Sequence, residues 1–177
     1  SFKTKGGRTV YDGGGIVPDI ELRSGEFSSI TTALLKDQAI FDYATKYYYN
    51  NNINNWEDFS FSNRDFQDFL AFLKTHNFEY ETETEKLFSK ALRKSKDEHL
   101  QKDISSSYNQ LMIVLDDAKE KALVEKKDEI INLLSDEILK RYFYRDGMYK
   151  YHLSYSPEIL EAVSVLNNTS RYQKILK

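Results

Sequence analysis

Histidine side chains are the residues of this sequence best suited to metal binding or to proton transfer near neutral pH. The three histidines, His76, His99 and His152, lie far apart in the chain and match no metal-binding spacing. Glu98 precedes His99, but the second histidine of a His-Glu-x-x-His motif does not follow. We therefore expect surface or half-buried histidines, and we expect no metal and no cofactor.

Two acidic pairs, Asp116–Asp117 and Asp128–Glu129, contain the carboxylates that acid–base catalysis by paired acids requires. Adjacent residues on a helix point in different directions, however, and do not face one another. Lysines are interleaved with both pairs. This pattern indicates solvated helix faces rather than a catalytic site.

The glycine cluster of Asp12–Gly15 has the composition of a phosphate-binding loop. It lacks the Gly-Lys-Ser/Thr ending of such a loop, and Val17–Pro18 follows where a helix would have to start. We therefore interpret the cluster as a structural turn.

Composition indicates a globular chain and excludes several functions. Of the 177 residues, 40% are hydrophobic, including 13 tyrosines and 11 phenylalanines, which provides enough apolar material for an aromatic-rich core. The net charge is −3, with no dense basic stripe, so nucleic-acid binding is not expected. The absence of cysteine excludes disulfides and a cysteine nucleophile. No apolar stretch is long enough to span a membrane.

Helix-breaking residues are confined to the ends of the sequence. Six of the seven glycines lie between Gly6 and Gly25, and the two prolines are Pro18 and Pro157. Between residues 26 and 156 Gly147 is the only glycine and proline does not occur, which predicts a helical region. The fold class expected is therefore mainly α, a multi-helix bundle after a short extended segment.

The first 25 residues have a different pattern from the rest. Residues 8–11 and 16–20 are predicted to be short strands separated by the glycine turn. Two strands alone are marginally stable in water, and the rest of the sequence predicts no others. Because the chain also begins without methionine, we expect it to be a piece of a longer protein whose upstream part holds the sheet.

Helices are predicted at about 29–49, 62–76 and around 87–92, and Ser62 and Asp65 have capping-box spacing. Residues 104–145 have helical periodicity throughout, but the apolar seam shifts across 125–129, so two helices are favoured over one. Gly147 is expected to end this region as a left-handed cap. Ser156–Pro157 predicts another helix start, and residues 171–176 a short final turn.

A specific resemblance rests on GRTVYDGGGIVPDI at residues 7–20 and on the preceding Phe2–Thr4. This segment is similar to the one that closes the catalytic domain of carboxy-terminal processing, or tail-specific, serine peptidases (the S41-type family). Downstream, residues 34–44, 137–142 and 171–176 resemble helices that follow the catalytic domain in a bacterial subgroup. The resemblance implies that residues 1–25 are terminal strands of the upstream peptidase domain, and that residues 26–177 form the helical C-terminal domain.

The family uses a catalytic Ser–Lys pair, and the resemblance implies that both residues lie upstream. Ser89–Lys90 and Lys94–Lys96 are the nearest substitutes in this chain. A general-base lysine must be desolvated, whereas these lysines lie in a charged run. We therefore assign no catalytic, cofactor-binding or metal-binding residue here.

Two aromatic runs, Tyr47–Tyr49 and Tyr142–Tyr144, cover too much of a helix circumference to be wholly buried. They fit either amphipathic surface tyrosines or a docking surface against the catalytic core or a partner. Both interpretations stay open.

Two functions remain to be compared. In the first, the helical domain braces the peptidase core or docks a substrate or an adaptor protein, and the parent enzyme, a hydrolase, cuts proteins near their C-termini. The resemblance places that enzyme in the cell envelope, in the periplasm. In the second, the chain is a freestanding helical protein–protein interaction module. In either case the unpaired edges of residues 1–25 permit strand-mediated homo-oligomers.

Overall fold

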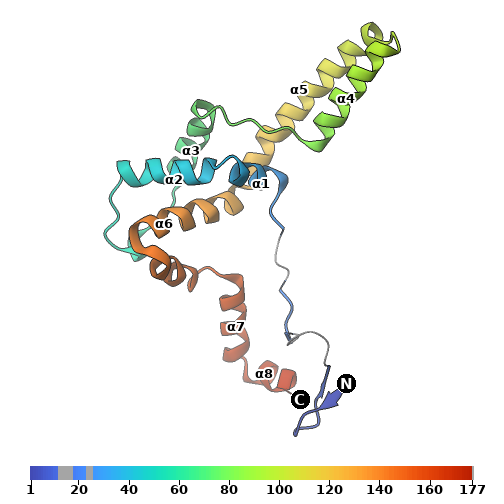
Figure 1. The fold of residues 1–177 in the computed structure, drawn as a ribbon. Coiled ribbons are helices and arrows are strands. Elements are labelled where there is room, and N and C mark those ends of the chain that lie inside the picture. Colours follow the sequence, from blue (N-terminus) through green and yellow to red (C-terminus); the bar gives the residue numbers. More distant parts are fainter. Residues whose placement is uncertain (12–17, 23–25, 177) are drawn as a thin grey trace.

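The computed structural model describes residues 1–11, 18–22 and 26–176 of the chain. It is mainly α-helical, as predicted (Figure 1). A small antiparallel hairpin of β1 (Phe2–Lys3) and β2 (Thr9–Val10) precedes the helices. The helices are α1 (Ser29–Lys36), α2 (Ala39–Asn50), α3 (Asn63–Thr75), α4 (Glu83–Asp97), α5 (Gln101–Glu125), α6 (Lys127–His152), α7 (Pro157–Asn167) and α8 (Thr169–Leu176), with a 3-10 turn at Trp56–Asp58.

The hairpin differs from the predicted arrangement of strands. Thr9–Val10 pairs with Phe2–Lys3, which lies before it in the sequence. Gly7, with φ of 85°, supplies the left-handed residue of the connecting turn. All four strand residues are exposed. Of the second predicted strand, residues 16–17 and the glycine cluster lie outside the described residues, and Asp19–Ile20 forms a bend.

The predicted helix over 29–49 is two helices. Gln38 adopts left-handed geometry (φ 64°) between α1 and α2 and so breaks the helix. Neither glycine nor proline marks the break, so the sequence pattern missed it. The bend lets both Leu34 of α1 and Ile40 of α2 enter the same core, where both are fully buried.

Side-chain caps begin several helices where the sequence predicted them. Ser62 and Asp65 form a complete capping box at α3, and Ser156 caps α7 with Pro157 at its first position. Thr82 and Glu85 form a second capping box, which begins α4. Each cap satisfies backbone N–H groups that have no partner within the helix.

The long helical region from 101 to 152 is divided in two, as predicted, at Lys126 between α5 and α6. The expected cap at Gly147 is wrong, because Gly147 is buried inside α6 and its φ is not positive. The interruption lies instead at Tyr144 (φ 56°, ψ −160°), so that α6 consists of two helical segments. The close contact of Phe143 with Gly147 explains why that position has no side chain.

The core lies where α2, α3 and α6 meet, with α1 at its edge. It consists of fourteen buried residues, including Leu34, Ile40, Phe66, Phe69 and Leu139. Tyr43 lies at its centre, in edge-on contact with Phe69 and Phe72, and donates a hydrogen bond to the Asp65 carbonyl (2.9 Å). The pair α4–α5 extends away from this core as an arm, and α7–α8 leads away from it on another side (Figure 1). Within the described residues, no helix is long and apolar enough to cross a membrane.

Candidate functional site

The serine and lysine residues considered for catalysis lie on the α4–α5 arm. Ser89 Oγ is 3.1 Å from Tyr108 Oη of α5, and Ser95 is buried and donates to the Leu92 carbonyl (2.7 Å). The lysines of this stretch, Lys90, Lys94 and Lys96, are exposed. Both hydroxyls therefore serve the packing of the arm, and the exposed lysines lack the desolvation that a general base requires.

The three histidines lie in three separate environments. His76 Nε2 is 3.2 Å from Asp37 Oδ2, and His152 Nε2 is 2.8 Å from Asp136 Oδ1. His99 occupies a left-handed position (φ 59°) at the turn between α4 and α5. Over the described residues, histidine and acidic side chains form no group arranged to hold a metal ion.

The two aromatic runs meet each other, which the sequence did not predict. The rings of Tyr48 and Tyr142 are 4.8 Å apart, and Tyr142 Oη donates to the carbonyl oxygens of Tyr48 (3.2 Å) and Asn51 (2.7 Å). Part of each run thus joins α2 to α6. Tyr49 and Tyr144 remain 80% and 81% exposed, so these two members of the runs have the most surface free for a partner.

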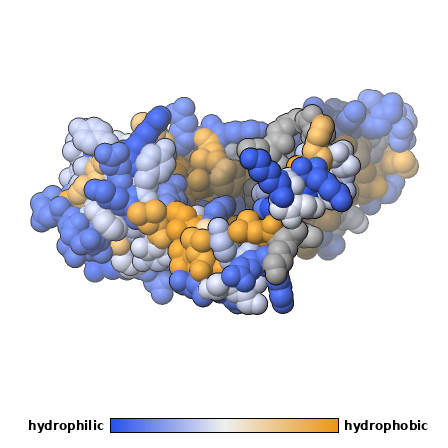
Figure 2. All heavy atoms as spheres, turned by 90° about the horizontal axis from the view of Figure 1, so that it is seen from below, coloured by the Kyte–Doolittle hydropathy of each residue, from blue (hydrophilic) through white to orange (hydrophobic). Residues whose placement is uncertain are grey.

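An apolar helix face on α7 is left without a partner in this chain. Leu160, Val163 and Leu166 are 52%, 48% and 65% exposed although their spacing places them on one side of the helix. Val165, on a different side of α7, is buried. None of the core residues comes from α7 or α8. Hydrophobic side chains gather on the lower side of the molecule, the side on which Figure 1 places these helices (Figure 2).

Helix α8 packs onto α7 and continues this surface. Arg171 forms an ion pair with Glu161 of α7, which fixes the two helices to one another. Tyr172 and Leu176 of α8 are half exposed. We call the exposed apolar residues of both helices, namely Leu160, Val163, Leu166, Tyr172 and Leu176, the α7–α8 face. Exposed apolar patches on folded domains are a common feature of contacts with other surfaces.

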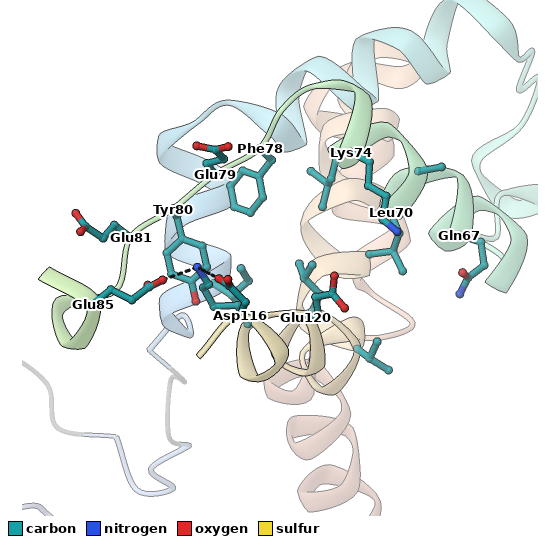
Figure 3. A pocket seen from close by; sticks show the side chains of 16 residues that line it. Gln67, Leu70, Lys74, Phe78, Glu79, Tyr80, Glu81, Glu85, Asp116 and Glu120 are labelled. Atoms are coloured by element: carbon teal, nitrogen blue, oxygen red, sulfur yellow. Dashed lines mark hydrogen bonds and ion pairs between the residues drawn. The ribbon is translucent and has the colours of Figure 1, made fainter. Parts of the chain in front are cut away.

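A groove of about 1110 Å³ lies between α3, α5 and the segment that connects α3 to α4. Its apolar lining includes Leu70, Phe78, Leu123 and Val124. Figure 3 shows Phe78 and Tyr80 projecting from the connecting segment and Leu70 projecting from α3. The groove is large enough for a ligand bigger than most small molecules.

A three-residue ion network closes one end of the groove. Lys119 Nζ of α5 is 2.6 Å from Glu85 Oε1 and 2.7 Å from Asp116 Oδ1. Glu85 is 3% exposed and also accepts the backbone N–H of Thr82 (2.6 Å). Burial alone would raise the pKa of Glu85, but the hydrogen bonds from Lys119 and Thr82 outweigh it and lower that pKa.

The sequence pattern does not predict this network. Asp116 belongs to one of the acidic pairs, but Glu85 and Lys119 are 34 residues apart. One local signal was available, because Thr82 and Glu85 have the spacing of a capping box. The pairing with Lys119 depends on the antiparallel packing of α4 against α5, which no local pattern specifies.

The fold defines the class of protein: a mainly α-helical domain, preceded by a short hairpin, that leaves an apolar helix face exposed. Comparison with known families then identifies the chain more closely. Residues 30–166 match the family described as "Probable PDZ-protease, C-terminal helical domain", and the chain belongs to this family. Searches of curated proteins and of solved structures found no match.

Family membership confirms the resemblance to the C-terminal region of a processing protease. It also implies a protease part in the parent protein. Serine chemistry, cleavage near C-termini and the location in the cell envelope remain predictions from the sequence.

Proposed function

We propose that residues 26–177 form the non-catalytic C-terminal helical domain of a carboxy-terminal processing serine peptidase, and that the α7–α8 face packs against the protease part of the same polypeptide. In this role the domain braces the catalytic core. The parent enzyme hydrolyses proteins near their C-termini in the cell envelope. Residues 1–25 are the last strands of the protease domain and lead directly into the helices.

The observation that carries this proposal is the exposure of an amphipathic helix on its apolar side. In α7 the residues Leu160, Val163 and Leu166 face solvent, although such side chains are normally the buried side of a helix. Full burial of such a side chain contributes roughly 1.5–3 kcal/mol, so covering the half of each that is exposed would contribute about 1 kcal/mol. The family to which the chain belongs supplies a partner for this face, because its members are C-terminal domains of proteases.

The test uses the full-length parent protein with Val163→Asp and Leu166→Asp combined. We expect the double variant to separate the helical domain from the protease part, because two carboxylates cannot be buried unpaired in an apolar contact. Differential scanning calorimetry should then show a lowered or split unfolding transition. Cleavage of a protein substrate near its C-terminus should fall in parallel.

Ser164→Asp is the matched control, because Ser164 is an exposed polar residue of the same helix. It should leave both measurements unchanged. Circular dichroism of the 177-residue chain carrying the double substitution checks that the domain itself still folds. If the double variant unfolds and cleaves like the wild type, the α7–α8 face does not hold the protease part and the bracing role is wrong.

A further inference from the structure

The groove beside α5 has a lining that is apolar on its floor and acidic at its rim. Five carboxylates and two lysines line it, which gives the lining a net charge of −3. Lys119 is already neutralised by Glu85 and Asp116. Glu79, Glu81 and Glu120 are exposed and make no ion pair within the described part of the chain. The uncompensated charge of the groove is therefore negative.

The segment along one side of the groove is neither helix nor strand, and its backbone polar groups are unused. Residues 78–82 have no helical or strand structure. Phe78 N–H donates to the Leu73 carbonyl and Thr82 N–H to Glu85. Between these two anchors, the backbone N–H and C=O groups of Glu79, Tyr80 and Glu81 make no hydrogen bond among the described residues. Such a segment offers a pairing edge to another extended chain.

We propose that this groove binds an extended segment of a protein in which basic and apolar residues alternate. Side chains of an extended chain point alternately to opposite sides. Pairing along residues 79–81 would place one set of side chains on the floor formed by Leu70, Leu123 and Val124. The other set, lysine or arginine, would reach the carboxylates of Glu79, Glu81 and Glu120. This site lies away from the α7–α8 face and does not depend on the proposed function.

The charge of the groove favours a protein segment over other ligands of similar size. Nucleic acids and anionic lipid surfaces would be repelled by a lining of net charge −3. A free C-terminal carboxylate would be repelled in the same way, so the bound segment is an internal stretch or an N-terminal one. A simple polycation would use the rim but leave the apolar floor exposed.

The experiment is fluorescence anisotropy of the 177-residue chain with a capped, labelled peptide of alternating lysine and leucine. Two comparison peptides replace lysine with glutamate or leucine with serine. We expect the lysine–leucine peptide to bind most tightly, and each comparison peptide to bind roughly tenfold or more weakly. Equal binding of the glutamate peptide would show unspecific apolar adhesion. Equal binding of the serine peptide would show a site for cations alone. Either result overturns the proposal.

Charge reversal in the chain tests where the peptide binds. The triple variant Glu79→Lys, Glu81→Lys and Glu120→Lys should weaken binding roughly tenfold or more, because each pair of opposite charges becomes a pair of like charges. These residues are exposed, so the variant should retain its fold.

A matched triple variant, Asp97→Lys, Asp117→Lys and Asp146→Lys, makes the same change in net charge at exposed positions outside the groove lining. It should bind like the wild type. If it weakens binding as much as the groove variant does, the peptide responds only to overall charge and the proposed site is wrong.

Two matched substitutions on α5 test whether the apolar floor of the groove contributes to binding. Val124 lines the groove and is 59% exposed, whereas Val114 is 61% exposed and lies outside it. Val124→Ser should weaken binding several-fold through the loss of apolar contact, and Val114→Ser should leave it unchanged. Equal effects of the two substitutions would show that the peptide makes no apolar contact with Val124 and the groove floor.

Discussion

Lys119 of α5 lies 2.6 Å from Glu85, the third residue of α4, and so links the root of the projecting arm to the groove. The pair has low exposure, since the Glu85 side chain is 3% and the Lys119 side chain 22% exposed. Removing one member of such a pair leaves the other charge poorly solvated, which costs more than the net contribution of the intact pair. Glu85 has a second role, because its carboxylate also caps α4.

We predict that Glu85→Gln and Lys119→Met each lower the free energy of unfolding by about 1–3 kcal/mol. The double variant should lose less than the sum of the two, because it leaves no poorly solvated charge: Asp116, the other partner of Lys119, is 65% exposed. Urea unfolding of the four proteins in this cycle measures the coupling. Lys121→Met, a substitution of an exposed lysine on the same helix, is the control and should have little effect. Strict additivity of the two losses would contradict the interaction.

The same pair predicts a pH dependence of stability. The pKa of Glu85 is lower in the folded state, so ionised Glu85 stabilises the fold above its unfolded pKa. This contribution is lost as the pH falls through the lowered folded pKa. The difference in stability between wild type and Glu85→Gln should therefore be greatest near neutral pH and shrink in acid. If the stability difference between wild type and Glu85→Gln does not change with pH, the charge of Glu85 does not contribute to stability.

Tyr142 joins α6 to the end of α2 through hydrogen bonds to the carbonyl oxygens of Tyr48 and Asn51. Tyr142→Phe keeps the ring contact with Tyr48 and removes only the hydroxyl. We expect a loss of about 1 kcal/mol in the free energy of unfolding, the usual contribution of a hydrogen bond. Tyr144→Phe, at an 81% exposed position nearby, should cause no measurable change in a parallel denaturation curve. Equal effects of the two substitutions would contradict this role of the Tyr142 hydroxyl.

The sequence predicted elements with strong local signals and missed those that depend on tertiary contacts. The capping box of Ser62 and Asp65 and the start of α7 at Pro157 were correct because each is specified within four residues. The break at Gln38 was missed, because left-handed geometry at a residue other than glycine is selected by packing on both sides of it. The pairing of β2 with the preceding β1 could not be predicted, because the two residues of β1 are too few to show a strand pattern.

The surfaces were predictable only in outline. The aromatic runs were correctly identified as unable to be wholly buried, but their contact through Tyr48 and Tyr142 requires α2 and α6 to lie side by side. The groove combines residues from three separate parts of the chain, and its carboxylates look like ordinary surface acids in the sequence. Amphipathic α7 was predicted as a helix, yet its periodicity could not show that its apolar side would stay exposed.

Position 147 requires glycine because Phe143 lies too close for a side chain, and not because the backbone has a positive φ. A Cβ atom added there would overlap Phe143 Cβ. We therefore expect Gly147→Ala to lower the free energy of unfolding by about 1–3 kcal/mol, although alanine is the better helix former. Because the clash is with Cβ, Phe143→Ala should not relieve it, whereas Phe143→Gly should relieve it in part. Thermal unfolding of the single and combined variants checks this, and a stabilising Gly147→Ala would contradict it.

Asp136 is a half-buried carboxyl that the fold makes harder to ionise. Burial raises its pKa, and this effect exceeds the opposing influence of His152, whose Nε2 lies 2.8 Å away, and of Lys140. A carboxyl with a raised pKa holds its proton more tightly in the folded state. Stability therefore falls as the pH rises from the unfolded pKa of Asp136 through its folded pKa.

Asp136→Asn replaces the carboxyl with a neutral group of the same shape and removes this cost of ionisation. We predict that the variant is more stable than the wild type at neutral pH, even though it changes the 2.8 Å contact with His152. The advantage should vanish in acid, where Asp136 is protonated in both folded and unfolded chains. Melting temperatures of both proteins across that pH range give the comparison. A variant that is less stable than the wild type at neutral pH would show that the contact with His152 outweighs the burial of the charge.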